Sequence, residues 1–197
     1  RLNNDTFVLG DNMIRKIIIS CIAATSLILF STQAFALLNF SVGVPLSHTM
    51  TGKDTRGNDL ESDGVSGTFV QIGVPILPGI GMDNYKTKVK TTGTTKIELS
   101  TTMYNLYYLL PIPIINLTVG VGVGKTKFLC DSSDCDWQDG GSATQWYTSF
   151  GFPIIPLFDL HLSYRSVSSK IETTTGSDKG KEDDVGGNVM GLGIGFN

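Results

Sequence analysis

The residues best suited to catalysis lie in one short segment, "FDLHLSYRS" at 158–166. His161 and Ser163 are two positions apart in it, so on a β-strand their side chains point to the same face. A histidine beside a serine can take the hydroxyl proton and create a nucleophile, provided that an acidic group orients the imidazole. Asp159 and Arg165 share that face, however, so a bonded network of polar side chains is the competing interpretation.

Two cysteines, Cys130 and Cys135, enclose a second reactive segment, "CDSSDCDWQDGG". Its aspartates could bind a metal ion, but their spacing does not match the calcium-binding loop, which closes with a glutamate. In an oxidising compartment, two cysteines this close in a short loop favour a disulfide. We therefore predict a Cys130–Cys135 disulfide in a solvated loop, with no metal site and no cofactor.

The N-terminal region predicts export into such a compartment. Residues 13–36 have the order of a secretory signal peptide, with a basic start, an apolar run, and a small-x-small cleavage site formed by Ala34 and Ala36. The apolar run is short for a transmembrane helix, which needs roughly 20 apolar residues. The predicted organisation is an upstream leader without function at 1–12, the signal peptide at 13–36, and a single domain at 37–197.

The region after the signal peptide predicts strands rather than helices. Alternation with period two recurs along it, and three short apolar segments begin at Pro75, Pro111 and Pro153, where proline is compatible with strand ends. Long polar segments separate them, so short turns alternate with long loops. The pattern predicts an all-β fold of eight antiparallel strands near 38–47, 65–74, 79–87, 97–109, 114–127, 144–152, 157–167 and 187–197.

One face of these strands is apolar, and the other is small or polar. In "INLTVGVGVGKT" at 115–126, Val119, Val121 and Val123 alternate with glycines. A soluble ligand-binding barrel would turn the apolar face inward, but its outer face should then be rich in charge, whereas here that face is mostly Gly, Ser, Thr and Asn. We therefore predict an eight-stranded up-and-down transmembrane β-barrel whose apolar rows meet lipid and whose glycines line a narrow interior.

Charged and hydroxyl-bearing side chains on the second face would point into this interior. Because buried charges must be paired, they should form a polar network that rigidifies the barrel. The predicted members are Asp83, Tyr85, Tyr107, Asp159, His161 and Arg165. An eight-stranded interior is about filled by its own side chains, so a narrow conduit for small solutes or a hydrophobic ligand is the less favoured alternative.

At this point the sequence resembles the small eight-stranded outer-membrane β-barrel proteins of Gram-negative bacteria, of the OmpA transmembrane-domain and OmpX type. The last predicted strand, "NVMGLGIGFN", is similar to the C-terminal signal that the barrel assembly machinery reads in that group; here it comprises Gly191, Gly193, Gly195 and Phe196. Members of the group usually end on the aromatic residue, whereas Asn197 follows it here.

The resemblance implies an outer-membrane location, a monomer, and the membrane lipid, lipopolysaccharide and barrel assembly machinery as partners. A formal net charge of −3 gives no indication of nucleic-acid binding. The expected role is non-enzymatic, either structural in the cell envelope or exerted through the surface loops.

A local resemblance supports the enzymatic alternative. The lipid A 3-O-deacylases carry a His-x-Ser catalytic pair on a late strand, and His161-Leu162-Ser163 is similar to it. Strand parity argues against this function, because Leu160, Leu162 and Tyr164 occupy the lipid side. His161 and Ser163 would then face the interior, where a lipid ester cannot reach them.

Overall fold

The computed structural model describes residues 38–54, 57–90, 96–110, 112, 115–130, 140–155, 157–174 and 179–196. The predicted leader and signal peptide, with Ala34 and Ala36, lie outside the described residues, and so does the predicted Cys130–Cys135 disulfide. Within the described part of the chain, no helix is long and apolar enough to cross a membrane.

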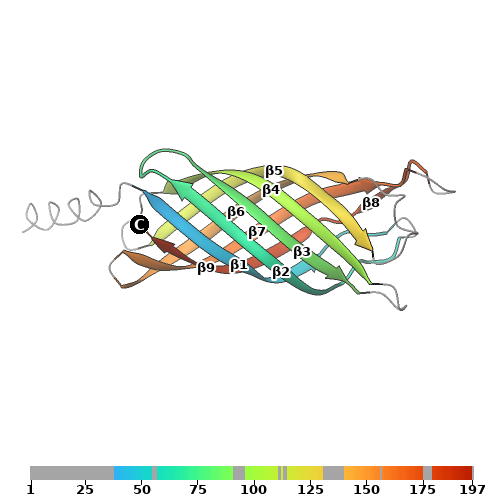
Figure 1. Ribbon diagram of the computed structural model, residues 1–197, viewed down its shortest axis with the longest axis horizontal. Coiled ribbons are helices and arrows are strands. Elements are labelled where there is room, and N and C mark those ends of the chain that lie inside the picture. Colours follow the sequence, from blue (N-terminus) through green and yellow to red (C-terminus); the bar gives the residue numbers. More distant parts are fainter. Residues whose placement is uncertain are drawn as a thin grey trace, which may run out of the picture. The chain divides into compact units, whose positions relative to one another are not determined.

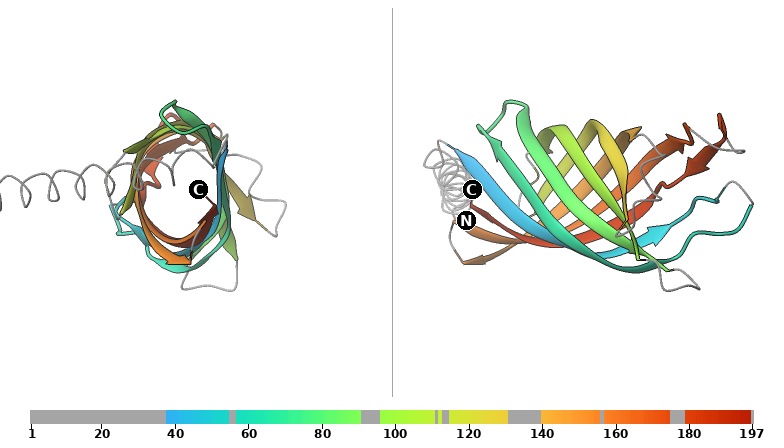
Figure 2. Two further views of the ribbon diagram at one scale, coloured as in Figure 1. Left: turned by 90° about the vertical axis from the view of Figure 1, so that its left-hand side faces the viewer. Right: turned by 45° about the vertical axis from the view of Figure 1, so that its right-hand side comes forward.

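The described residues form a closed antiparallel β-barrel (Figures 1 and 2). From β1 to β7, each strand pairs with its neighbours in sequence, and β9 closes the ring by pairing with both β7 and β1. The barrel strands are β1 (Asn39–Met50), β2 (Ser62–Gly73), β3 (Gly79–Val89), β4 (Ile97–Leu110), β5 (Asn116–Cys130), β6 (Gly141–Ile155), β7 (Phe158–Glu172) and β9 (Gly187–Phe196). The predicted fold, an all-β barrel of eight antiparallel strands, is confirmed.

A ninth strand was not predicted. β8 (Glu182–Asp184) pairs with the final residues of β7 from Lys170 to Glu172, and it lies in a segment that the sequence analysis assigned to a polar loop. Because β8 pairs with β7 alone, it extends one wall of the barrel beyond the ring.

Several strands also run further toward the long loops than predicted. β7 ends at Glu172 instead of 167, β5 ends at Cys130 instead of 127, and β6 begins at Gly141 instead of 144. Polar residues continue these strands because backbone hydrogen bonding to the neighbouring strand does not depend on side-chain polarity. The side of the barrel with the long loops is called the loop end below, and the side with the short proline turns is called the turn end.

The apolar rows point outward, as predicted. On β5, the side chains of Val121 and Val123 are 60% and 65% exposed, and their partners Leu106 and Tyr104 on β4 are exposed too. A band of apolar side chains therefore surrounds the barrel, which is the surface that a bilayer would cover.

Inside the barrel, the character of the buried side chains changes along the axis. The middle holds buried polar groups such as Asp83, Gln145 and Arg165. Nearer the loop end lies an upper apolar cluster of buried side chains, which comprises Met50, Leu99, Ile171 and Val185, with Leu60, Val89 and Phe128 packed against it.

The turn end carries strained apolar residues. Ile76 has φ 73° and Leu157 has φ 76°, a backbone region that favours glycine or asparagine. Each follows a proline, and Leu77 N–H donates to the Val74 carbonyl at 3.1 Å, as in a type II turn. Ile76 is 81% exposed, so no packing within the described barrel accounts for its side chain.

Candidate functional site

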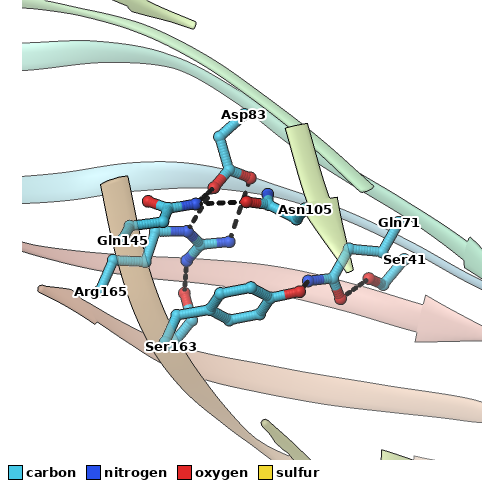
Figure 3. A network of polar contacts seen from close by, with 8 residues as sticks. Ser41, Gln71, Asp83, Asn105, Gln145, Ser163 and Arg165 are labelled. Carbon is cyan, nitrogen blue, oxygen red and sulfur yellow. Dashed lines mark hydrogen bonds and ion pairs between the residues drawn. The ribbon is translucent and has the colours of Figure 1, made fainter. Parts of the chain in front are cut away.

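The most strongly organised group of side chains surrounds a buried ion pair in the middle of the barrel (Figure 3). Arg165 on β7 donates from Nε to Asp83 Oδ2 at 2.9 Å and from Nη2 to Asp83 Oδ1 at 3.4 Å. The two side chains are 3% and 0% exposed. Two charges removed from water require each other, because the desolvation of either one alone would cost several kcal/mol.

Neutral polar side chains form hydrogen bonds to the ion pair. Gln145 Nε2 on β6 donates to Asp83 Oδ2 and to Asn105 Oδ1 on β4, each at 2.6 Å. Arg165 Nη1 donates to Ser163 Oγ at 2.5 Å. The result is a network that links β3, β4, β6 and β7 across the interior.

Aromatic rings hold the guanidinium on its remaining sides. Arg165 Cζ lies 3.5 Å from the centroid of the Phe69 ring and 5.1 Å from that of the Tyr147 ring, both within the range of cation–π attraction. Tyr85, which is buried, meets the Phe69 ring edge to face at 6.1 Å. Phe69 did not enter the predicted network, although strand parity already placed it opposite the lipid-facing Val70.

A second polar chain runs beside the ion pair (Figure 3). Ser41 Oγ on β1 donates to Gln71 Oε1 at 3.0 Å, and Gln71 Nε2 on β2 donates to the Tyr147 hydroxyl at 2.7 Å. Strand parity put Ser41, Gln71 and Tyr147 on the interior face, but nothing in the sequence indicated their pairing.

Toward the turn end, the interior contains separate pairs. The Tyr107 hydroxyl donates to Asn39 Oδ1 at 2.5 Å, and Asn116 Nδ2 donates to Asp159 Oδ2. Ser149 Oγ and His161 Nδ1 are 3.3 Å apart.

The six predicted network residues are thus all buried, but they do not form one group. Asp83 and Arg165 are bonded directly, and Tyr85 packs near them through Phe69. Tyr107, Asp159 and His161 bond to other partners nearer the turn end.

Glycines on the interior face make room for the large side chains. A Cβ added at Gly120 would collide with the Tyr147 ring, and one added at Gly191 would collide with the Phe69 ring. Gly195 gives the same space to the His161 ring. The glycine rows of β5 and β9 therefore make room for bulky residues of other strands: Tyr147 on the adjacent β6, His161 on the adjacent β7, and Phe69 on β2, two strands away from β9.

The space left in this region is small. Two cavities beside His161 have volumes of about 10 and 20 Å³, each enough for about one water molecule. Among the described residues, no group of three or more His, Cys, Asp and Glu side chains could hold a metal ion.

The predicted catalytic pair has other partners. His161 Nδ1 lies beside Ser149, and the hydroxyl of Ser163 accepts a hydrogen bond from Arg165. Leu160 and Leu162 are exposed on the lipid side, so His161 and Ser163 face the interior.

The predicted assembly signal lies on β9. Phe196 points outward, and its ring meets that of Phe158 on β7 at 5.6 Å. Gly191, Gly193 and Gly195 lie on the opposite face of the strand, toward the interior.

No protein-family model matches this sequence, and a search of curated proteins finds no match. Solved structures do resemble it. The crystal structure of Neisserial surface protein A superposes with a TM-score of 0.60 at 12% sequence identity, over 82% of this chain and 97% of that protein.

Two further structures align over similar lengths. Outer membrane protein W of E. coli has a TM-score of 0.49 at 13% identity, covering 81% of this chain and 97% of the other. Ail, the attachment invasion locus protein of Yersinia pestis, has a TM-score of 0.42 at 14% identity, covering 80% and 98%.

The closed barrel, its apolar outer band and the likeness to Neisserial surface protein A define the fold class. The fold is that of the small eight-stranded outer-membrane β-barrels of bacteria. At these sequence identities the likeness concerns the fold alone.

Proposed function

We propose that the protein is an integral, non-enzymatic protein of the bacterial outer membrane, with a structural or surface-loop role and an interior closed to solutes. The observation that carries the proposal is the hydrogen-bonded ion pair of Asp83 and Arg165 in the middle of the interior. It cross-links the walls at the point where a conduit would have to pass. A closed barrel satisfies all backbone groups in the bilayer, so the apolar band can face lipid directly.

The arrangement of His161 and Ser163 supports the non-enzymatic role. A serine nucleophile needs a base that takes its proton, but Ser163 instead accepts a hydrogen bond from a cation. Its hydroxyl also faces away from the lipid, where an acyl ester would lie.

The proposed partners are the barrel assembly machinery, membrane lipids and lipopolysaccharide. We propose that the barrel assembly machinery recognises β9 through its outward apolar row and Phe196, and that the folded chain is a monomer among lipids and lipopolysaccharide. The ring has no unpaired barrel strand that would need a second copy, among the strands that the structure describes.

Conductance in a planar bilayer tests the closed interior. The folded wild-type protein is expected to show no single-channel steps, whereas an Asp83→Ala, Arg165→Ala double variant should conduct because the central cross-link is removed. Ser168→Ala, an exposed change on the outer face of β7, serves as the matched control. Regular conductance steps in the wild type would contradict the proposal.

Lipid A from cells that produce the protein tests the enzymatic alternative. The mass spectra are expected to be the same for the wild type, Ser163→Ala and cells without the protein. Loss of one hydroxyacyl chain that depends on Ser163 would establish a deacylase instead.

A further inference from the structure

A row of lysines lies on the outer wall of the barrel, just beyond the apolar band. Lys86 on β3, Lys125 and Lys127 on β5 all point outward and are exposed. Across the strands, Lys86 is opposite Ser100 of β4, and Ser100 is opposite Lys127. Toward the turn end, the next outward residue on β5 is Val123, which lies opposite Tyr104 in the apolar band. On β3, the polar Asn84 separates Lys86 from Met82 of that band. The ammonium groups therefore lie where the wall leaves the hydrocarbon.

These lysines differ from others near the loop end. Lys53, Lys90 and Lys170 each form an ion pair, with Asp59, Glu61 and Glu182 respectively. Among the residues that the structure describes, no carboxylate lies within 4.0 Å of the Lys86, Lys125 or Lys127 ammonium groups. Lys88 is also exposed on the outer face of β3, where it lies opposite Glu98 of β4. The described outer face of β3, β4 and β5 thus carries four lysines and one glutamate in this part of the wall, although the protein has a formal net charge of −3.

The same wall is hollowed. A groove of about 680 Å³ lies on the outer face of β4 and β5. The end-on view in Figure 2 shows the loop end of β5 leaning away from the ring. The lining side chains divide into an apolar part, Tyr104 and Val123, and a polar part, Ser100, Thr102, Lys125 and Lys127.

We infer that this groove binds a phosphorylated glycolipid of the outer leaflet. Its phosphates would lie on Lys125 and Lys127, which line the groove, and on Lys86, which lies beside the groove across from Ser100. The acyl chains would lie along Tyr104, Val123 and the apolar band below them. The hydroxyls of Ser100 and Thr102 can donate to the same phosphate or sugar oxygens. Ammonium–phosphate hydrogen bonds are charge-assisted and strengthen at the edge of the bilayer, where water is depleted.

The amphipathic lining favours a lipid over a soluble anion. A free sugar phosphate could use the lysines but would leave the apolar half of the groove uncovered. A lipid without phosphate could cover Tyr104 and Val123 but would leave the cations unpaired. The inference rests on the proposed outer-membrane location, because that is where a phosphorylated glycolipid reaches this level of the wall.

Native mass spectrometry of the full chain in detergent, titrated with bis-phosphorylated lipid A, tests the inference. The wild type is expected to retain bound lipid A, and the Lys86→Gln, Lys125→Gln, Lys127→Gln triple variant should bind about tenfold more weakly or worse. Lys170, an exposed lysine of β7 that forms an ion pair with Glu182, provides the matched control. The Lys170→Gln variant should bind lipid A as the wild type does.

Two further arms identify the source of the phosphate. Removing both phosphates from lipid A should weaken binding to the wild type. The loss should be at least as large as the loss that the triple variant shows with bis-phosphorylated lipid A. Glucose 1-phosphate, which has no acyl chains, should not displace bound lipid A. Full displacement by glucose 1-phosphate would overturn the assignment to a lipid, and equal binding by wild type and triple variant would overturn the site.

Gel migration before and after boiling separates these results from a folding defect. A variant whose gel migration still changes on boiling has a closed barrel. The single variant Lys125→Gln is a milder test, and its loss of lipid A binding is expected to be intermediate. If lipid A binding fails while the barrel still inserts into the outer membrane, the lipid site is wrong and the proposed location stands. If the protein is not recovered from the outer membrane, the proposed function itself is wrong.

Discussion

The middle of the barrel and its loop end have opposite arrangements of polar and apolar side chains. In the middle, β7 turns Leu160 and Leu162 outward and Arg165 inward. Six residues after Arg165, Ile171 is fully buried inside, and the exposed Lys170 lies beside it on the outer face. The comparison shows that the medium around the barrel, rather than the barrel itself, decides which face is apolar. In lipid the inside must be polar or small, and in water the inside must be apolar.

Breaking the central ion pair should have the largest effect on stability. Asp83→Ala leaves the Arg165 guanidinium buried without its counter-ion, which is expected to lower the free energy of unfolding by about 3–5 kcal/mol. Urea unfolding of the barrel in detergent, followed by tryptophan fluorescence, measures it. Asp63→Ala, an exposed change on β2, should shift the free energy by less than about 0.5 kcal/mol. Equal effects of the two variants would mean that the ion pair does not hold the middle of the barrel.

Removing one side chain from the upper apolar cluster should act through a cavity instead. Ile171 is 0% exposed, so Ile171→Ala is expected to cost about 3 kcal/mol in the same urea experiment. Because Asp83 and Arg165 keep all their partners, this variant should remain closed in a planar bilayer. An Ile171→Ala barrel as stable as the wild type would show that the loop end has no packed core.

One new charge can locate the boundary between the two regions. Leu162 and Ser168 both point outward on β7, the first in the apolar band and the second beyond it. Leu162→Lys should destabilise the barrel in lipid vesicles by about 2 kcal/mol, and Ser168→Lys by less than about 0.5 kcal/mol. Similar costs at both positions would place Ser168 inside the hydrocarbon as well.

Acid should weaken the loop end through His48. This side chain lies on β1 beyond Leu46, the last outward apolar residue of that strand, and its Nδ1 is 2.7 Å from Thr87 Oγ1. Burial lowers the pKa of His48 from 6.5 to about 4. Between these two values the unfolded chain binds a proton that the folded chain does not, so stability present above pH 6.5 is lost as the pH falls toward 4.

The expected loss from His48 is about 2 kcal/mol between pH 7.5 and pH 5. Urea midpoints at the two pH values measure it, with His48→Gln as the comparison, since glutamine keeps a polar group near Thr87 but does not titrate. If His48→Gln loses as much stability as the wild type, another group is responsible for the acid sensitivity.

Much of the barrel could be predicted from residue patterns. The alternation in "INLTVGVGVGKT" predicted a strand with Val121 and Val123 toward lipid, and both are exposed on the outer face. The proline segments at Pro75 and Pro153 correctly marked the turn end, whereas Pro111 lies outside the described residues. Strand ends at the loop side were missed because Lys170 and Ile171 lie among polar residues that also suit a loop. A signal was available, since the apolar parity of β7 changes from even positions up to Tyr164 to odd positions at Val167 and Ile171.

The interior partners depended on the three-dimensional arrangement. Asp159 and Arg165 share one face of one strand, yet Asp159 accepts from Asn116, and Arg165 pairs with Asp83. Strand tilt and stagger in a closed barrel decide which inward side chains reach the same level, and neither can be read along one strand.

By itself, the sequence determined the strands, their two faces, and the alternation of short turns with long loops, because these depend on local periodicity and turn chemistry. The tertiary structure decided which buried charge meets which, how the glycines of β5 and β9 accommodate Tyr147, Phe69 and His161, and where the apolar side changes from outside to inside. The physical reason is that closure of the barrel brings together side chains that are distant along the chain. Their burial energies then depend on neighbours and on the surrounding medium rather than on sequence spacing.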